Sequence, residues 1–203
     1  MSSSNWIRPG TGIYAAVWPR LDAVPRFGRS AEDTVSVERL ISLAPDAAIL
    51  GVDGHGPSAR SQETLDRLAA AGIPVVFVDF RNEPLIHTPR SMTVLGRLLG
   101  RERAAADYVQ FYADQLEWVA AGLKAAHRRP TVFLESHVGL SEECCRTMAD
   151  GMMGRMVEFA GGDNLARGVV PGAIGMIHLE EILTRQPEIY VGTAIGSGTT
   201  VRS

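Results

Sequence analysis

The feature that most constrains the fold is a short repeat, found once in each half of the chain. Residues 36–46 read SVERLISLAPD and residues 178–188 read HLEEILTRQPE, and the two align without a gap. Both copies carry a glutamate seven residues before a proline, an aliphatic pair after that glutamate, and an acidic residue after the proline. Helix–proline–strand junctions are common, so chance explains part of this match. The full register favours two equivalent helix–strand units, one in each of two lobes.

A long amphipathic stretch, residues 92–127, separates the two copies. From Arg103 onward its apolar residues follow the three-and-four spacing of one helical face, at Tyr108, Phe111, Tyr112, Leu116, Val119 and Leu123. Pro89 suits the start of a helix, and Pro130 stops a helix from continuing. The stretch fits either a surface helix of one domain or a strut that joins two lobes.

The repeat favours the strut and predicts three parts for the chain. An N-terminal α/β lobe would occupy residues 1–88, the connecting long helix residues 89–128, and a C-terminal α/β lobe residues 129–203. We therefore expect an α/β protein whose two lobes each contain a parallel sheet flanked by helices.

Helices and strands alternate in the first half. The sequence predicts helices at 36–44 and 61–71, and strands at 47–52 and 75–78. Ser36 is the expected cap of the first helix, with Glu38 in its first turn where the helix dipole favours a negative charge. In the second helix the side chains expected to face inward are Leu65, Leu68 and Ala69. This order of elements is typical of a parallel sheet with right-handed crossovers.

The second half has fewer clear strands. The sequence predicts strands at 131–134 and 189–191 and short helices at 152–160 and 178–185. The interior face of the helix at 152–160 is expected to carry Met152, Met153, Met156, Val157 and Phe159. The segment between the first strand and this helix, with both cysteines, is predicted to be a loop. A lobe with two strands would be incomplete, and its exposed edges would favour self-association into a homo-oligomer.

Composition narrows the function classes. With a net charge of −3 and 45% hydrophobic residues, the chain is typical of a soluble globular protein and not of a nucleic-acid-binding one. No apolar run reaches the length that spans a bilayer, and no signal peptide is visible at the start. The adjacent cysteines, Cys144 and Cys145, would form a strained disulfide, so two thiols or a partner outside the chain are expected instead.

Several stretches resemble the substrate-binding proteins of ATP-binding-cassette (ABC) importers for ferric siderophores, haem and cobalamin. They read SVERLISLAPDAAIL, LAAAGIPVVFVDF, TPRSMTVLGRLLGRERAAADYVQFY, VEFAGGDNLA and HLEEILTRQPEIYVGT. Together they cover most of residues 28–193 in the family's order. DFRNEPL and FLESHVGLSEECCRT are most similar to the iron-complex branch.

The resemblance implies two α/β lobes joined by one long helix, with a ligand cleft between them. It also implies a periplasmic or lipid-anchored extracytoplasmic location, no intrinsic cofactor, and two partners: a membrane permease and an iron chelate such as a siderophore, haem or a cobalamin-like compound. Family members usually begin with a secretory signal and a first strand, and extend well beyond the strand at Ile189. We therefore expect a second lobe that is only partly built. The chain would be a fragment, a truncated reading frame, or a domain completed by another copy.

Candidate ligand residues follow the predicted strands, because ligands gather at the carboxyl ends of strands in a parallel sheet. The five candidates are His55, Arg60, Arg81, Glu135 and His137. An arginine would pair with an anionic chelate through its planar fork, and a histidine would supply a hydrogen bond or a metal contact. Asp53 and Asp79 also follow strands. The alternative for each residue is a helix cap or a solvated loop position.

Enzymatic activity is not expected. A zinc hydrolase needs a compact pattern such as His-Glu-x-x-His, and neither this pattern nor a Gly-x-Ser-x-Gly elbow or phosphate loop is present. The alternatives to a transport role are a truncated, self-associating relic of the family and, less favoured, a metal-dependent hydrolase.

The resemblance also points to Glu38 and Glu180, which occupy the same position in the two copies of the repeat. In that family an acidic residue on each lobe docks onto basic pockets of the two permease subunits. A two-fold permease would require one carboxylate per lobe. The alternative is that each glutamate only stabilises the start of its own helix.

Overall fold

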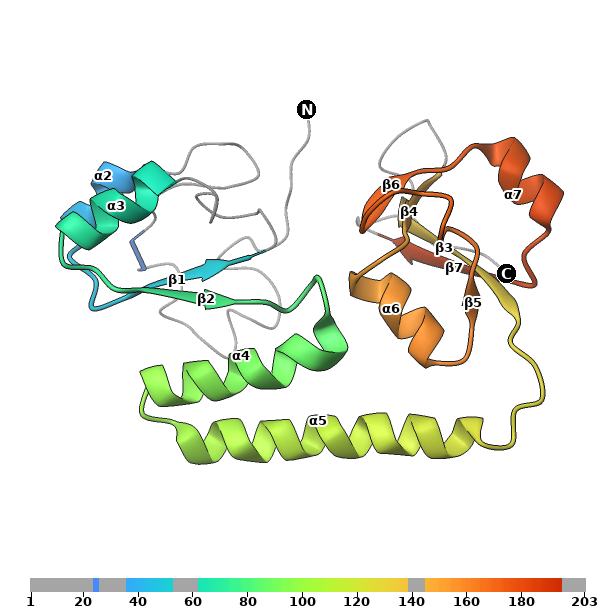
Figure 1. Ribbon diagram of the computed structural model, residues 1–203, viewed down its shortest axis with the longest axis horizontal. Helices are drawn as coiled ribbons and strands as arrows, with labels where there is room; N and C mark the ends of the chain where they lie inside the picture. Colours follow the sequence, from blue (N-terminus) through green and yellow to red (C-terminus); the bar gives the residue numbers. More distant parts are fainter. Residues whose placement is uncertain (1–23, 26–35, 53–61, 139–144, 195–203) are drawn as a thin grey trace. The chain divides into compact units, whose positions relative to one another are not determined.

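The computed structural model describes residues 24–25, 36–52, 62–138 and 145–194. The chain divides into two compact units, residues 1–78 and 79–203 (Figure 1). In the described part no helix is long and apolar enough to cross a membrane.

The first unit has the alternation that the sequence predicts. Its elements are α2 (Val37–Ser42), β1 (Ala48–Gly51), α3 (Gln62–Ala70) and β2 (Val75–Val78). β1 and β2 pair in parallel, with Ala48 beside Val75. A parallel pair needs a crossover connection, and α3 lies within it.

A small apolar core holds this unit together. It consists of Leu40, Ala48, Leu68 and Ile73, with Ile41 among the half-buried side chains packed against it. Leu68 is fully buried, whereas Ala69, predicted to face inward, is exposed. Consecutive residues of a helix point about 100° apart, so Ala69 turns away from the face that Leu68 buries.

The predicted long helix is two helices. α4 (Pro84–Leu98) and α5 (Glu102–Leu123) are separated by a turn at Gly100, whose φ of +62° lies in the left-handed region. Pro89, predicted to start the helix, lies inside α4, which begins at Pro84. The 22 residues of α5 correspond to a length of about 33 Å.

The two helices pack closely where both carry small residues. A Cβ atom added at Gly96 would lie 2.4 Å from the Cβ of Ala105, so only glycine permits this approach. The Tyr112 hydroxyl donates a hydrogen bond to the Pro84 carbonyl at 2.9 Å. Of the residues predicted to form one apolar face of α5, Tyr108 and Phe111 are exposed instead. The other four predicted residues of that face are half-buried.

The second unit contains a mixed sheet. Its strands are β3 (Thr131–Val138), β4 (Arg146–Met148), β5 (Asp163–Asn164), β6 (Ile174–Met176) and β7 (Ile189–Ala194). β3 pairs in parallel with β7 and β5 and antiparallel with β4, and β4 pairs antiparallel with β6. The sequence predicts β3 and β7 but not the three short strands, and it places β4 in a loop. A purely parallel sheet is therefore wrong for this unit.

Two helices complete the second unit, α6 (Met152–Phe159) and α7 (Leu179–Arg185). The main core cluster comprises Phe133, Cys145, Ala149, Leu165, Ala166, Val170, Ile177 and Ile182. Met153 and Met156, predicted to face the interior, are exposed. Cys145 is disulfide-bonded, so the expectation of a thiol is wrong for this residue; Cys144 lies outside the described residues.

Candidate functional site

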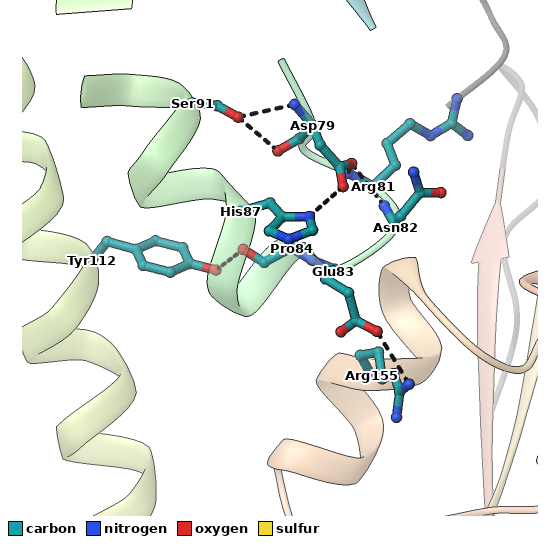
Figure 2. A network of polar contacts seen from close by, with 9 residues as sticks. All are labelled: Asp79, Arg81, Asn82, Glu83, Pro84, His87, Ser91, Tyr112 and Arg155. Carbon is teal, nitrogen blue, oxygen red and sulfur yellow. Dashed lines mark hydrogen bonds and ion pairs between the residues drawn. The ribbon is translucent and has the colours of Figure 1, made fainter. Parts of the chain in front are cut away.

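The candidate site is built on the loop that follows β2, residues 79–83, here called the Arg81 loop. Its sequence, DFRNE, lies between the end of the strand and Pro84, which begins α4. Figure 2 shows the contacts that hold this loop and the Arg81 side chain, which points away from the Asp79 carboxylate. Arg81 is half-buried.

Asp79 organises the Arg81 loop from within. Its carboxylate Oδ1 accepts hydrogen bonds from the backbone N–H groups of Arg81 and Asn82, both at 2.9 Å. Its own N–H donates to the Ser91 hydroxyl at 2.9 Å, and that hydroxyl donates to the Asp79 carbonyl at 3.0 Å. Short polar side chains favour such turns because they satisfy nearby backbone donors. The loop is thereby fixed to α4.

His87 of α4 contacts the second carboxylate oxygen. Its Nδ1 lies 2.6 Å from Asp79 Oδ2, and the side chain of Asp79 is 9% exposed. Burial alone would raise the pKa of Asp79, but hydrogen bonds from the Arg81 N–H, from His87 and from the Asn82 N–H outweigh it and lower the pKa. Asp79 therefore remains charged at neutral pH, and its negative charge is satisfied within the loop and α4.

The start of α6 holds the outer side of the Arg81 loop. The N–H of Met152 donates to the Arg81 carbonyl at 2.6 Å. Gly151, with a φ of +114°, would place a Cβ 2.9 Å from the Asn82 carbonyl oxygen. A side chain is excluded there on both steric and conformational grounds. The backbone of Arg81 is thus fixed from two sides.

Charged side chains join the same two segments. Arg155 of α6 forms an ion pair with Glu83 at 3.1 Å and lies 3.8 Å from Glu158, which in turn contacts Arg167 at 3.0 Å. Pairs this exposed contribute little free energy each. The Glu83–Arg155 pair is the one among them that joins the loop to α6.

Glu135, a predicted ligand residue, lies on β3 and is half-buried. Its carboxylate accepts a hydrogen bond from the Tyr190 hydroxyl of β7, and the Tyr190 ring contacts the ring of Phe133. Burial, together with the hydrogen bond to the Glu135 carboxylate, raises the pKa of Tyr190 to about 12. Tyr190 therefore stays protonated and keeps donating to Glu135 at neutral pH.

The other predicted ligand residues are less well placed. His55 and Arg60 lie outside the described residues, and for His137 only the backbone, in β3, is described. Whether the five residues converge on one ligand stays a prediction. Within the described residues no group of three or more His, Cys, Asp or Glu side chains could hold a metal ion.

The two predicted docking residues are both exposed. Glu38 lies in the first turn of α2 and forms an ion pair with Arg67 of α3 at 2.7 Å. Glu180 lies in the first turn of α7, where its carbonyl accepts a hydrogen bond from the Thr184 hydroxyl. They belong to different units, and their role in docking stays a prediction.

Sequence reasoning named Asp79 and Arg81, whose role in a site stays a prediction, and missed the residues that hold their loop. His87, Gly151 and Arg155 come from segments far along the chain or on a helix, and no local pattern links them to the loop. A weak signal was present at Asp79, since an aspartate followed by polar residues at the end of a strand often caps a turn. Tyr190 carried no signal beyond its place in a predicted strand.

The sequence matches the periplasmic binding protein family over residues 14–201. The chain belongs to this family. The solved structures described next are also of binding proteins. A search of the curated proteins found none that matches this chain.

Solved structures share the fold at low sequence identity. The TroA-like periplasmic binding protein FepB from Veillonella parvula matches with a TM-score of 0.71 and 24% identity, over 88% of this chain and 51% of that one. The periplasmic haem-binding protein RhuT from Roseiflexus sp. RS-1 matches with a TM-score of 0.66 and 19% identity, over 88% and 64%. The periplasmic vitamin B12 binding protein BtuF of Vibrio cholerae matches with a TM-score of 0.67 and 18% identity, over 89% and 65%.

These matches confirm the predicted α/β fold with two lobes. The chain spans between 51% and 65% of the length of these three structures. It therefore contains part of the architecture that the relatives have in full.

Proposed function

We propose that this chain acts as the substrate-binding component of an ABC importer, taking up an iron chelate or a similar metal-bearing ligand and delivering it to a membrane permease. The observation that carries the proposal is the family match over residues 14–201. Two of the structural relatives bind haem and vitamin B12, both of which are metal ions held in an organic macrocycle. An extracytoplasmic location and a binding rather than catalytic role are part of the same proposal.

Arg81 is the residue we assign to the ligand. Its guanidinium can donate two parallel hydrogen bonds to a carboxylate or another anionic group of a chelate. The Arg81 loop is held by Asp79 on one side and by the start of α6 on the other. Because the backbone of this loop is already fixed, less conformational entropy is lost when a ligand binds. The remaining candidates, His55, Arg60, Glu135 and His137, would complete the site.

Glu38 and Glu180 are the residues we assign to the permease. Both carboxylates are exposed, and each lies in the first turn of its helix. A buried glutamate could not reach a basic pocket on a partner. Because rim charges act mainly on association and its salt dependence, permease binding should weaken as the ionic strength rises.

The test is a titration of the purified chain with three coloured probes: haemin, cobalamin and a ferric hydroxamate siderophore. Native mass spectrometry of freshly prepared protein would add any ligand that co-purifies. We expect saturable binding of at least one probe. No binding of any of the three, together with no co-purified adduct, would contradict the proposed function.

Arg81→Ala should weaken binding of that probe by about tenfold to a hundredfold, the range for losing a hydrogen bond to a charged group. Asp79→Asn, which keeps the guanidinium but loosens its loop, should weaken binding less. Arg90→Ala is the matched control, because it removes an exposed arginine of α4 outside the loop. Equal affinity for the wild type and Arg81→Ala would remove Arg81 from the site.

The double variant Glu38→Lys/Glu180→Lys separates docking from ligand binding. It should bind the probe as the wild type does but lose binding to the permease, measured with reconstituted transporter. Normal permease binding by this double variant would exclude the docking role.

A further inference from the structure

The imidazole ring of His87, in the first part of α4, is held by a carboxylate. Its Nδ1 lies 2.6 Å from Asp79 Oδ2, and Figure 2 shows the ring beside that carboxylate. An ionised carboxylate only accepts hydrogen bonds, so the proton of this contact lies on Nδ1. The contact fixes the orientation of the ring and leaves Nε2 as the nitrogen that can bind another group.

The histidine is the more accessible member of this pair. The side chain of Asp79 is 9% exposed, whereas that of His87 is 37% exposed. The carboxylate already accepts two backbone N–H groups of the Arg81 loop at Oδ1 and the imidazole at Oδ2. Within the described part of the chain, no group forms a hydrogen bond with Nε2 of His87. His87 can therefore offer a nitrogen to a ligand, and Asp79 holds it in place.

A histidine held by a carboxylate is a common arrangement at metal centres. The carboxylate fixes the tautomer and the orientation of the ring, and it makes the other nitrogen a better donor. Imidazole is a suitable ligand for iron. A bare ion would need several ligands, and the described residues provide no group of three or more His, Cys, Asp or Glu side chains that could hold one. A metal that arrives in a chelate brings most of its ligands with it, so one imidazole is enough.

The kind of chelate follows from the coordination positions that it leaves open. A siderophore that surrounds its iron completely leaves no position for a protein nitrogen. A planar macrocycle leaves the axial positions open, and histidine is a common axial ligand of haem iron. The same segment of the chain also exposes apolar side chains, 41% of Phe80 and 52% of Ile86. Apolar surface with a single fixed polar group suits a flat, largely apolar ring.

We propose that His87 is an axial ligand to the metal of a macrocyclic chelate such as haem, and that Asp79 is the residue that positions it. A coordinate bond forms from the Nε2 lone pair to the metal, the water or anion in that axial position leaves, and the Nδ1 proton stays on the ring. The assignment of His87 rests on the proposed function, and it narrows the ligand from any iron chelate to a metal macrocycle.

The test is haemin binding by the full chain, followed by ultraviolet–visible and electron paramagnetic resonance spectroscopy, which report whether an imidazole nitrogen is bound to the iron. The informative variant is His87→Asn. The asparagine amide can still donate to Asp79 from the position of Nδ1, but it has no nitrogen that can coordinate a metal. Its haemin complex should lose the imidazole signature. The dissociation constant should rise at least about tenfold, the lower end of the cost of losing even a residue that only orients a metal ligand.

Two further variants separate coordination from other roles. His127→Asn is the matched control, because it removes an exposed histidine that follows α5, and it should leave both the spectrum and the affinity unchanged. Arg81→Ala should weaken haemin binding but keep the imidazole signature, because a guanidinium pairs with anionic groups and does not coordinate iron. Far-ultraviolet circular dichroism verifies that each variant folds.

An imidazole signature that persists in His87→Asn, or that is missing from the wild-type complex, would overturn the assignment of His87. Binding of the ferric hydroxamate or of cobalamin without binding of haemin would also overturn it, while leaving the proposed function standing. Failure of all three probes, with no co-purified adduct, would contradict both.

Discussion

The two copies of the repeat have the same backbone conformation, but their side chains make different contacts. α2 and α7 occupy equivalent positions in them, and each leads into a strand paired in parallel, β1 with β2 and β7 with β3. The residue before the proline has a left-handed conformation in both, with φ of 45° at Ala44 and 46° at Gln186. Such a conformation is costly for a residue other than glycine. Its presence in both copies indicates that the same turn connects helix to strand.

The side chains that begin the two helices differ. The Ser36 hydroxyl accepts a hydrogen bond from the Arg39 N–H at 3.1 Å, whereas His178 makes no such bond at the start of α7. Glu38 is paired with Arg67, while for Glu180 the described residues provide no side-chain partner. The second copy thus lacks both the cap and the ion pair of the first.

The aliphatic pairs differ as well. Leu40 and Ile182 are buried, with exposed fractions of 6% and 8%. Their neighbours diverge, because Ile41 packs against the core of the first unit and Leu183 is 63% exposed. One apolar position of the repeat therefore supports the core in both copies, and the other supports it only in the first.

The largest expected effect comes from shortening the shared core residue. Leu40→Ala and Ile182→Ala should each lower the free energy of unfolding by about 2–5 kcal/mol, because each leaves a cavity in a packed cluster. Ile41→Ala should cost less, and Leu183→Ala should stay within about 0.5 kcal/mol, as for an exposed site. Urea unfolding followed by circular dichroism measures these differences. An equal cost at Ile41 and Leu183 would mean that the two copies are packed alike.

The repeat could be found from sequence because its signals are local. A capping serine, the aliphatic spacing and the proline each act within a few residues, and so the helices and strands around both copies were predicted correctly. The spacing of Met153 and Met156 was also read as a core face, yet both are exposed. Spacing identifies the apolar side of a helix, but only tertiary packing decides whether that side is covered.

The short strands and the site contacts could not be found in the same way. β4 contains Arg146 and Thr147, and its pairing with β6 depends on residues far along the chain. Gly151 approaches the Arg81 loop only after α6 has packed. The break at Gly100 was visible as a glycine, but whether a glycine ends a helix depends on what the next helix packs against. Non-local contacts of this kind leave no periodic trace in the sequence.

A smaller effect is expected from exchanging the helix caps. Ser36→Ala should lower the free energy of unfolding by about 1 kcal/mol, because it removes the acceptor for an N–H at the start of α2. His178→Ser should raise stability by a similar or smaller amount, since it supplies α7 with the cap that the other copy has. Thermal unfolding of both variants tests whether stability falls in Ser36→Ala and rises in His178→Ser. Destabilisation by His178→Ser would indicate that His178 has a contact that serine cannot replace.

The smallest expected effect is on the pH dependence of stability, and it comes from the Glu38–Arg67 ion pair, which only the first copy has. A hydrogen bond from the Arg67 guanidinium, together with contacts to the backbone and to Ser36, lowers the pKa of Glu38 from its ordinary value of 4.5. A depressed carboxyl pKa stabilises the folded state above the ordinary value, and this contribution is lost as the pH falls through the folded-state value.

Arg67→Ala should therefore destabilise the chain slightly at neutral pH, because both side chains are exposed and surface pairs are weak. The difference from the wild type should shrink as the pH is lowered below 4.5 and as salt is added. Urea unfolding at a series of pH values measures it. Arg90→Ala of α4 is the control for loss of a helix arginine, because Arg90 is exposed and forms no ion pair with another described residue. A difference that is the same at neutral and acid pH would show that Arg67 stabilises α3 by packing and not through the charge of Glu38. The first copy would then resemble the second, in which the described residues provide Glu180 with no side-chain partner.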